Sequence, residues 1–373
     1  MPRRPRLLSL TALTRAYQRN LKALVRATRP ARPARLAKVA ALTPVAKAPR
    51  PRKPAAVRAS TRPIAAARSE WEGGVAPGPA GARRYHLYVP PALAARRGET
   101  FPLLVMLHGC GQTGRDLAIS SRMNRLAARE RFLVLYPEQE RVANVHGCWN
   151  WFERRNGKAE AEAATLLAAV DKVARRHPVD LARVAVAGLS AGASMAALMA
   201  ALYPERFCAV AMHSGVAPGT AESAATAIAA MQGRRAAQLP ERLASAQAQG
   251  LPATAAPGLA ALAAPALPPL LIVHGDADGV VSVRNAAATA ALWAQALGAR
   301  AGAVRTQQRG QRHAMQVTEF KARGRTVVAL REVAGLAHAW SGGLGERPYS
   351  DPAGPDASAL VWAFVARQFR TKK

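Results

Sequence analysis

The pentapeptide Gly188-Leu189-Ser190-Ala191-Gly192 constrains the possible folds of this chain more than any other feature. It lies between an apolar, strand-like run (ARVAVAG) and a helix-like run of small residues (AGASMAALMAAL). A serine on such a strand–turn–helix bend projects its hydroxyl above the sheet, and the flanking glycines avoid a steric clash. The amide of Ala191, at the start of the helix, can donate to a developing oxyanion. We therefore interpret Ser190 as a nucleophile, with a structural Gly/Ser turn as the alternative.

Short apolar runs alternate with helical patterns from about residue 82 onward. Apolar strands joined by helical crossovers form a mostly parallel sheet that is covered on both faces. The sequence therefore predicts an α/β fold with a mostly parallel central sheet and helices on both faces. The predicted strands are Tyr85–Val89, Leu103–Leu107, Phe132–Tyr136, Val184–Ala187, Ala209–His213, Leu270–Val273 and Val327–Val333, and the predicted helices are Ala161–Arg176, Ala191–Tyr203, Asn285–Leu297 and Ala357–Phe369. Residues 216–267, which are rich in Ala, Gln and Pro, are longer than an ordinary loop and are predicted to form a cap over the site.

A serine on such a bend requires an acid and a histidine later in the chain, in that order. Only His313 and His338 follow every plausible acid, and His313 lies in a polar run typical of a surface. His338 lies on a glycine-containing loop after a predicted strand, which favours it as the base over an ordinary loop histidine. Asp276 and Asp278 both follow the strand at 270–273, and their position alone does not choose between them. One of the two is expected to stabilise the turn through an Asx hydrogen bond.

The loop after the strand at 103–107 is expected to supply a second oxyanion donor. It contains His108-Gly109-Cys110-Gly111-Gln112. We predict that the backbone amides of Cys110 and Ala191 form the oxyanion hole, and that His108 is a packed residue that fixes the loop.

Aromatic residues concentrate after the third predicted strand, in the segment CWNWF at 148–152, and Trp340 follows His338 by two residues. Such a group is typical of an apolar substrate cleft, and core packing is the alternative. The residues predicted to bind substrate are Trp149, Asn150, Trp151 and Trp340.

The chain has only three cysteines, which excludes both a disulfide scaffold and a CxxC zinc site. Cys110 and Cys148 both flank the predicted cleft, so we predict a disulfide between them and a buried Cys208. Three reduced thiols, as in a cytosolic protein, are the alternative.

Most of the net charge of +31 comes from residues 1–69, which hold 18 Lys/Arg and no Asp or Glu. Residues 7–28 have one mostly apolar helical face, and residues 29–69 are rich in Pro, Ala and Arg. We therefore predict that residues 1–69 form a largely disordered basic arm. The predicted catalytic domain follows at residues 70–373. We interpret the arm as a surface anchor, with a solvated tail or an export signal as alternatives. One tyrosine and no recognition fold argue against specific nucleic-acid binding. The sequence contains no run of eighteen uncharged apolar residues, so it predicts no transmembrane helix.

Taken together, these residues resemble the polyhydroxybutyrate (PHB) depolymerase family of α/β-hydrolase esterases. The matching pieces span about residues 83–358: RRYHLYVP, LHGCGQ, YPEQ, CWNWF, VDLARVAVAGLSAGASMA, YPERF, HGDADGVVSV, LAHAWSGG and YSDPAGPDAS. The resemblance implies Ser190 as nucleophile, His338 as base and Asp278, three residues after Gly275, as acid.

The resemblance also implies an activity without metal or cofactor: hydrolysis of short-chain polyhydroxyalkanoate or its oligomers. A feruloyl or acetylxylan esterase is the alternative within enzymes, and a surface- or polyanion-binding protein with a vestigial hydrolase domain is the rival from another class. Most family members are secreted, but the first residues contain no clear signal peptide, so association with intracellular granules through residues 1–69 is the alternative location.

Overall fold

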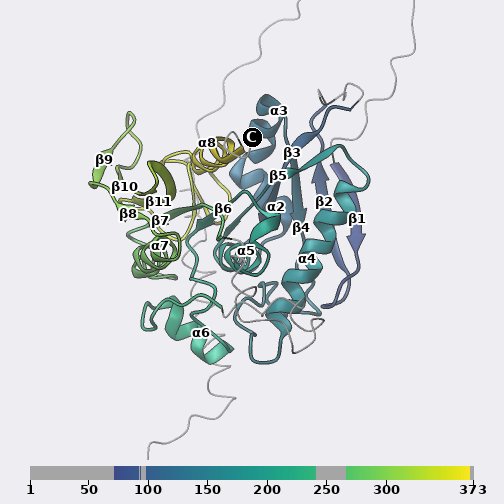
Figure 1. Ribbon diagram of the computed structural model, residues 1–373, viewed down its shortest axis with the longest axis horizontal. Helices are drawn as coiled ribbons and strands as arrows, with labels where there is room; N and C mark the ends of the chain where they lie inside the picture. Colours follow the sequence, from purple (N-terminus) through teal and green to yellow (C-terminus); the bar gives the residue numbers. More distant parts are fainter. Residues whose placement is uncertain (1–70, 92, 94–97, 241–265, 370–373) are drawn as a thin grey trace, which may run out of the picture.

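The central sheet has eleven strands in the part of the chain that the computed structural model describes, residues 71–91, 93, 98–240 and 266–369 (Figure 1). Its strand order is β1-β2-β4-β3-β5-β6-β7-β11-β10-β8, with β9 paired to β10. The strands are β1 (Trp71–Ala76), β2 (Arg83–Tyr88), β3 (Phe101–Leu107), β4 (Leu133–Pro137), β5 (Val179–Leu189), β6 (Ala209–His213), β7 (Leu270–Gly275), β8 (Arg300–Ala301), β9 (Arg305–Gln307), β10 (Met315–Ala322) and β11 (Arg325–Val333), and a separate short pair consists of β12 (Trp340–Ser341) and β13 (Ser350–Asp351).

Six neighbouring strands in the centre of the sheet, β4-β3-β5-β6-β7-β11, run parallel. The strands outside this group pair in the antiparallel sense. The carboxyl ends of parallel strands meet at one edge, where ligands bind in open α/β sheets. The loops after β3, β5, β7 and β11 therefore converge on one site.

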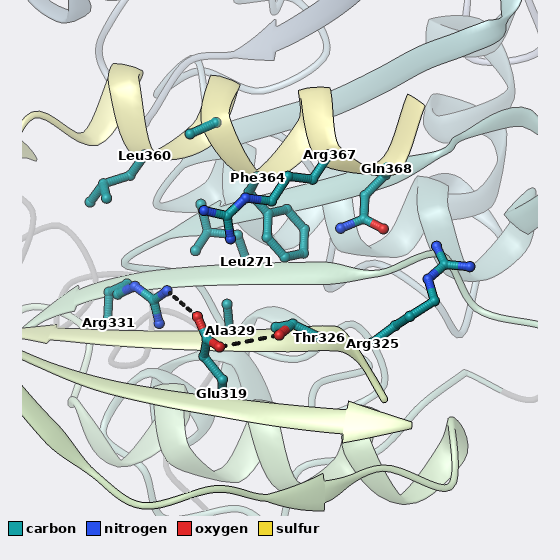
Figure 2. Close-up of a pocket in the computed structure, with 11 residues that line it drawn as sticks. Leu271, Glu319, Arg325, Thr326, Ala329, Arg331, Leu360, Phe364, Arg367 and Gln368 are labelled. Atoms are coloured by element: carbon teal, nitrogen blue, oxygen red, sulfur yellow. Dashed lines mark hydrogen bonds and ion pairs between the residues drawn. The ribbon is translucent and has the colours of Figure 1, made fainter. Parts of the chain in front are cut away.

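Helices cover both faces of the sheet (Figure 1). One face packs against α4 (Lys158–Ala174), α5 (Ala191–Leu202) and α7 (Arg284–Ala296). The other face packs against α2 (Gly114–Ser121), α3 (Met123–Glu130) and α8 (Ala357–Phe369). Along β3, Leu103, Val105 and Leu107 face the first layer while Leu104 and Met106 face the second, so the strand is buried on both sides. A small pocket remains between α8 and the strands β10 and β11 (Figure 2).

The predicted mostly parallel sheet with helices on both faces is confirmed, and all seven predicted strands and four predicted helices are present. The prediction missed the helices α2, α3 and α6 and the strands β1, β8, β9, β10, β12 and β13. β10 (MQVTEFKA) alternates polar and apolar residues because it lies toward the edge of the sheet. β1 contains two glycines, and a side chain at Gly74 would collide with the ring of Tyr85 on β2. Neither strand has the continuous apolar run used to find the central strands.

The predicted cap falls partly within the described residues. Its first part contains α6 (Ala224–Met231), which lies below the main body in Figure 1. The remainder of the predicted cap, residues 241–265, and the predicted basic arm lie outside the described residues. Among the helices that are described, none is long and apolar enough to cross a bilayer.

Candidate active site

Ser190 occupies a sharp bend between β5 and α5, with φ 58° and ψ −121°. These backbone angles are unusual for a residue with a side chain and hold the serine in a strained conformation. A β-carbon on Gly188 would lie 2.3 Å from the backbone of Gly192, and one on Gly192 would lie 2.1 Å from the carbonyl oxygen of Leu107. The two glycines are therefore required by close backbone packing, as the sequence predicted.

Asp278 and His338 meet although they are 60 residues apart in the sequence. His338 Nδ1 lies 2.7 Å from Asp278 Oδ2, and both side chains are almost fully buried. The other carboxylate oxygen, Oδ1, accepts hydrogen bonds of 2.9 Å from the amides of Val280 and Val281. The acid is therefore held on both sides, and its Oδ2 fixes the orientation of the imidazole.

A second histidine, His274 on β7, also contacts this acid and was not predicted. Its Nε2 lies 3.3 Å from Asp278 Oδ2 and 2.9 Å from the carbonyl oxygen of Val281. Burial alone would raise the pKa of Asp278, but hydrogen bonds from His274 and His338 outweigh it and hold the pKa well below its usual range. The carboxylate is thus ionised at neutral pH.

Asp276, the other candidate acid, contacts the histidine loop and not His338. Its Oδ1 accepts a 2.7 Å hydrogen bond from the amide of Gly335, which lies at the start of the loop that carries His338. Asp278 itself makes the Asx-type turn contacts, with Val280 and Val281. Asp276 therefore ties the acid loop to the histidine loop.

The loop after β3 is held by several contacts to its own residues, to Gln139 and to Trp149. His108 Nε2 accepts from the amide of Gln139, and its Nδ1 lies 2.9 Å from the carbonyl oxygen of Gly109. Gln112 Oε1 accepts from the Gly109 amide, and Trp149 Nε1 donates to the His108 carbonyl. His108 is fully buried, in agreement with its predicted packing role.

The two predicted oxyanion donors border the same cleft as Ser190 and His338, since Cys110 and Ala191 both line it. Within the described residues, no hydrogen-bond acceptor is paired with the backbone amide of either residue. Both amides are therefore candidate donors to an oxyanion formed at Ser190.

The predicted disulfide between Cys110 and Cys148 is present, and Cys208 is free and buried. The bond joins the loop after β3 to the aromatic segment, and the Gly111 amide adds a hydrogen bond to the carbonyl oxygen of His146. The disulfide therefore fixes the backbone at the residue whose amide is the candidate oxyanion donor.

Loss of this disulfide is expected to lower stability and activity together. Its two cysteines are 38 residues apart, and closing a loop of that length stabilises a fold by about 4 kcal/mol on the chain-entropy model. The Cys110→Ser/Cys148→Ser variant should lose stability of this order in urea unfolding, with lower kcat on a soluble ester. Cys208→Ala is the control, and its response to reductant should equal that of the wild type. Equal stability of wild type with and without reductant would contradict the prediction.

A cleft of about 800 Å³ lies beside Ser190 and His338. Its wall is mostly apolar, and α6 contributes several side chains to it. The apolar lining residues include Trp151, Phe152, Val216, Ile228, Met231 and Val281, and the polar ones include Gln232, Arg347 and Asp351. The described part of the predicted cap thus forms one wall of the cleft.

Only Trp151 of the four predicted substrate-binding residues lines this cleft. Trp149 is fully buried and supports the His108 carbonyl instead. Trp340 is also buried: its ring stacks on His213 at 5.1 Å, and its Nε1 lies 3.2 Å from Ser358 Oγ. Neither Trp149 nor Trp340 lines the cleft and both are packed in the interior, which corrects the prediction.

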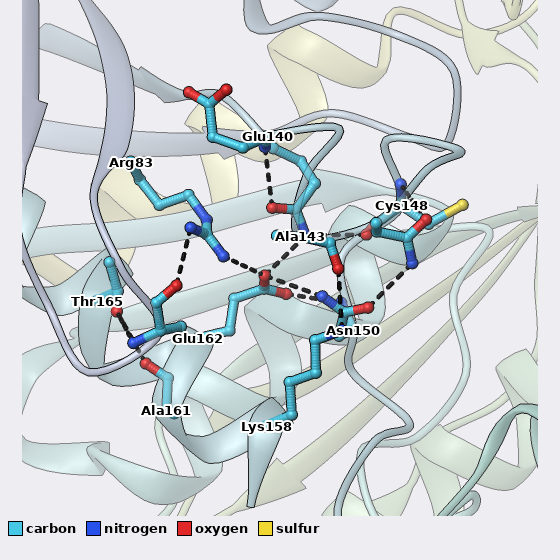
Figure 3. A network of polar contacts seen from close by, with 12 residues as sticks. Arg83, Glu140, Ala143, Cys148, Asn150, Lys158, Ala161, Glu162 and Thr165 are labelled. Carbon is cyan, nitrogen blue, oxygen red and sulfur yellow. Dashed lines mark hydrogen bonds and ion pairs between the residues drawn. The ribbon is translucent and has the colours of Figure 1, made fainter.

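Asn150, the fourth predicted residue, belongs to a buried polar network (Figure 3). At its centre is Glu162 on α4, whose side chain has no exposed surface. Glu162 accepts hydrogen bonds from Arg83, from Gln139 and from both the backbone and side-chain amides of Asn150. Gln139 also donates to the Cys148 carbonyl. The network thus anchors the segment that contains Cys148. It was not predicted, because its members lie far apart in the sequence.

Two buried histidines make stability depend on pH. Burial lowers the pKa of His108 to about 4 and that of His213 to about 3. Each is neutral when folded but binds a proton on unfolding below about pH 6.5, so the free energy of unfolding should fall from pH 6.5 toward pH 4. His213→Gln places an amide oxygen near the position of Nε2, where it can accept from the Ser341 amide, and should reduce this slope by about 1.4 kcal/mol per pH unit, measured by urea unfolding. An unchanged slope would contradict the assignment.

No group of three or more His, Cys, Asp or Glu side chains within the described residues is arranged to hold a metal ion.

Residues 83–316, more than half of the chain, match the family model described as esterase PHB depolymerase. The chain belongs to this family. Poly(3-hydroxyalkanoate) depolymerase C of Paucimonas lemoignei is a relative with 38% identity over 129 residues, which are 34% of this chain and 30% of that protein. Feruloyl esterase B of Neurospora crassa is 33% identical over 144 residues, which are 39% of this chain and 48% of that protein. The matches thus span less than half of either relative.

Among solved structures, the acetyl xylan esterase from Aspergillus awamori shares the fold of this family member. The TM-score is 0.54 at 21% identity, and the match covers 72% of this chain and 94% of that one. The architecture is thus that of an α/β-hydrolase esterase, as the sequence predicted.

Proposed function

We propose that this protein is a serine carboxylic ester hydrolase that acts through Ser190, His338 and Asp278. The observation that carries the proposal is the 2.7 Å contact between His338 Nδ1 and Asp278 Oδ2, on the cleft that Ser190 lines. Membership of an esterase family supports the same reaction class.

The orientation of His338 defines the proton path. Because Nδ1 donates to the ionised Asp278, the Nε2 nitrogen is free to accept the hydroxyl proton of Ser190. The serine oxygen attacks the ester carbonyl, and a tetrahedral oxyanion forms. His338 then returns the proton to the departing alcohol, and water hydrolyses the acyl-enzyme with the same histidine as base.

The oxyanion is stabilised by the amides of Cys110 and Ala191 in this mechanism. One well-placed donor of this kind contributes about 3 kcal/mol to transition-state stabilisation. The disulfide, Gln112 and Trp149 hold the loop before the substrate arrives. The donors therefore need little reorganisation during the reaction.

Short-chain polyhydroxyalkanoate or its oligomers are the substrate that we propose. The cleft wall of Trp151, Phe152, Ile228 and Met231 is apolar and suits the aliphatic body of a hydroxyacid polyester. The similarity to a poly(3-hydroxyalkanoate) depolymerase supports this choice. Residues 1–69, which lie outside the described part, would serve as an anchor to the polyester surface.

A feruloyl or acetylxylan esterase is the second candidate. The polar side chains Gln232, Arg347 and Asp351 on the cleft wall can hydrogen-bond to sugar hydroxyls. A feruloyl esterase is also among the relatives. The two candidates differ in which part of the cleft holds the alcohol side of the ester.

A substrate panel separates the candidates. We expect kcat/KM on 3-hydroxybutyrate oligomers to exceed that on methyl ferulate or acetylated xylan by more than about tenfold. Ser190→Ala is the control for every substrate, because it removes the proposed nucleophile. Preference for either carbohydrate ester would support the second candidate, and equal rates for enzyme and control on all substrates would contradict both.

A further inference from the structure

A second cavity, of about 240 Å³, lies between α8 and the strands β7, β10 and β11 (Figure 2). We call it the α8 pocket. Its polar lining includes Glu319, Arg325, Arg331 and Arg367, and Leu271 and Phe364 supply apolar surface. It is separate from the cleft beside Ser190, since the two cavities have no lining residue in common.

The α8 pocket has more positive than negative charge on its walls. Glu319 is its one carboxylate, and Arg331 Nη2 lies 3.3 Å from Glu319 Oε1. Arg305, which lies just outside the lining, approaches the same carboxylate at 3.9 Å. Among the described residues, no carboxylate forms an ion pair with Arg325 or Arg367, so the lining has two positive charges in excess.

Arg331 is the least exposed of these guanidinium groups, with 12% of its side chain accessible to solvent. Burial lowers its pKa, and although Glu319 opposes this effect, Arg367 and Arg305 add to it as neighbouring like charges. Glu319 balances only one of these positive charges, so a second anion beside Arg331 would be electrostatically favoured. The geometry and charge thus favour an anionic ligand here.

We propose that the α8 pocket binds the phosphate group of a small phosphomonoester. Such a group carries about 1.5 to 2 negative charges at neutral pH, which matches the excess charge of the lining. Planar guanidinium groups donate paired hydrogen bonds to phosphate oxygens. Leu271 and Phe364 offer apolar surface beside the arginines for a small organic group.

The site is distinct from the catalytic cleft in position as well as in lining. Arg325 begins β11, whereas the loop that carries His338 follows the opposite end of the same strand. Arg325 and Arg367 are exposed, and among the described residues neither forms a hydrogen bond or ion pair with Ser190, Asp278 or His338. Binding and ester hydrolysis can therefore be measured independently.

Titration of the full chain with phenyl phosphate, inorganic phosphate and phenol at constant ionic strength tests the proposal. We expect saturable heat and a rise in Tm with phenyl phosphate, weaker binding of inorganic phosphate and none of phenol. The Arg325→Gln/Arg367→Gln variant should bind phenyl phosphate at least about tenfold more weakly. Arg175→Gln/Arg176→Gln, at two exposed sites on the opposite face of the sheet, is the charge-matched control and should bind as wild type does.

Glu319→Gln distinguishes a ligand site from general attraction to a basic surface. It removes the competing carboxylate and frees Arg331, so phenyl phosphate should bind several-fold more tightly. Equal binding by inorganic phosphate and phenyl phosphate would assign the site to free phosphate. Absence of saturable binding, or equal affinity in Arg325→Gln/Arg367→Gln and Arg175→Gln/Arg176→Gln, would overturn the proposal. If Arg325→Gln/Arg367→Gln is unfolded by circular dichroism, the Glu319→Gln titration alone decides, with tighter binding supporting the site and unchanged or weaker binding refuting it.

Discussion

Replacing Ser190 with alanine is expected to lower kcat/KM for p-nitrophenyl butyrate by at least about a thousandfold. The substitution removes the only atom that can form the acyl-enzyme in the proposed mechanism. It leaves the backbone of the bend and its packing against Gly188 and Gly192 in place, so the variant should unfold at a similar urea concentration. Initial rates with wild type and variant at matched concentrations measure the effect.

Ser194→Ala is the matched control, since Ser194 lines the same cleft one turn further along α5. Its hydroxyl accepts from the Val216 amide and has no role in the proposed reaction, so its loss should cost far less than that of Ser190. His338→Ala should match Ser190→Ala, and the double variant should lose little more because the groups act as a unit. Comparable rates for Ser190→Ala and wild type would refute the assignment.

Replacing Asp278 with asparagine is expected to reduce kcat by about ten-thousandfold. The amide would donate to His338 Nδ1, which stabilises the imidazole tautomer that cannot accept the serine proton. An amide oxygen can still accept from Val280 and Val281, so the turn should survive. Steady-state kinetics together with the urea midpoint separate the loss of rate from a loss of stability.

Asp276→Asn is the control for the acid assignment. Asparagine retains an oxygen acceptor for the Gly335 amide, so the histidine loop should remain in place and the rate should change little. A larger loss of rate in Asp276→Asn than in Asp278→Asn would contradict the placement of the acid.

The sequence predicted the features that depend on local residue patterns and on the order of the motifs along the chain. Apolar runs located the central parallel strands, and the glycines around Ser190 predicted the bend. The order of serine, acid and histidine left Asp276 and Asp278 open, because both follow β7 directly. Resemblance to the PHB depolymerase family selected Asp278, which is the one that contacts His338.

Contacts between distant segments could not be predicted in this way. Trp149 and Trp151 have the same residue type and lie two positions apart. Trp149 nevertheless packs against the loop after β3, whereas Trp151 lines the cleft. Glu162 resembles an ordinary helix carboxylate until α4 places it beside Arg83. The role of His274 likewise depends on the turn that brings Asp278 back over β7.

Mass spectrometry after reaction with p-nitrophenyl butylphosphonate tests the central claim most directly. The serine oxygen forms a bond to phosphorus as p-nitrophenolate leaves, which gives a stable analogue of the tetrahedral intermediate. We predict one adduct per chain, located on Ser190 by peptide mapping, absent in Ser190→Ala and formed far more slowly in His338→Ala. An adduct on any other residue, or no adduct on an enzyme that hydrolyses p-nitrophenyl butyrate, would contradict the proposed mechanism.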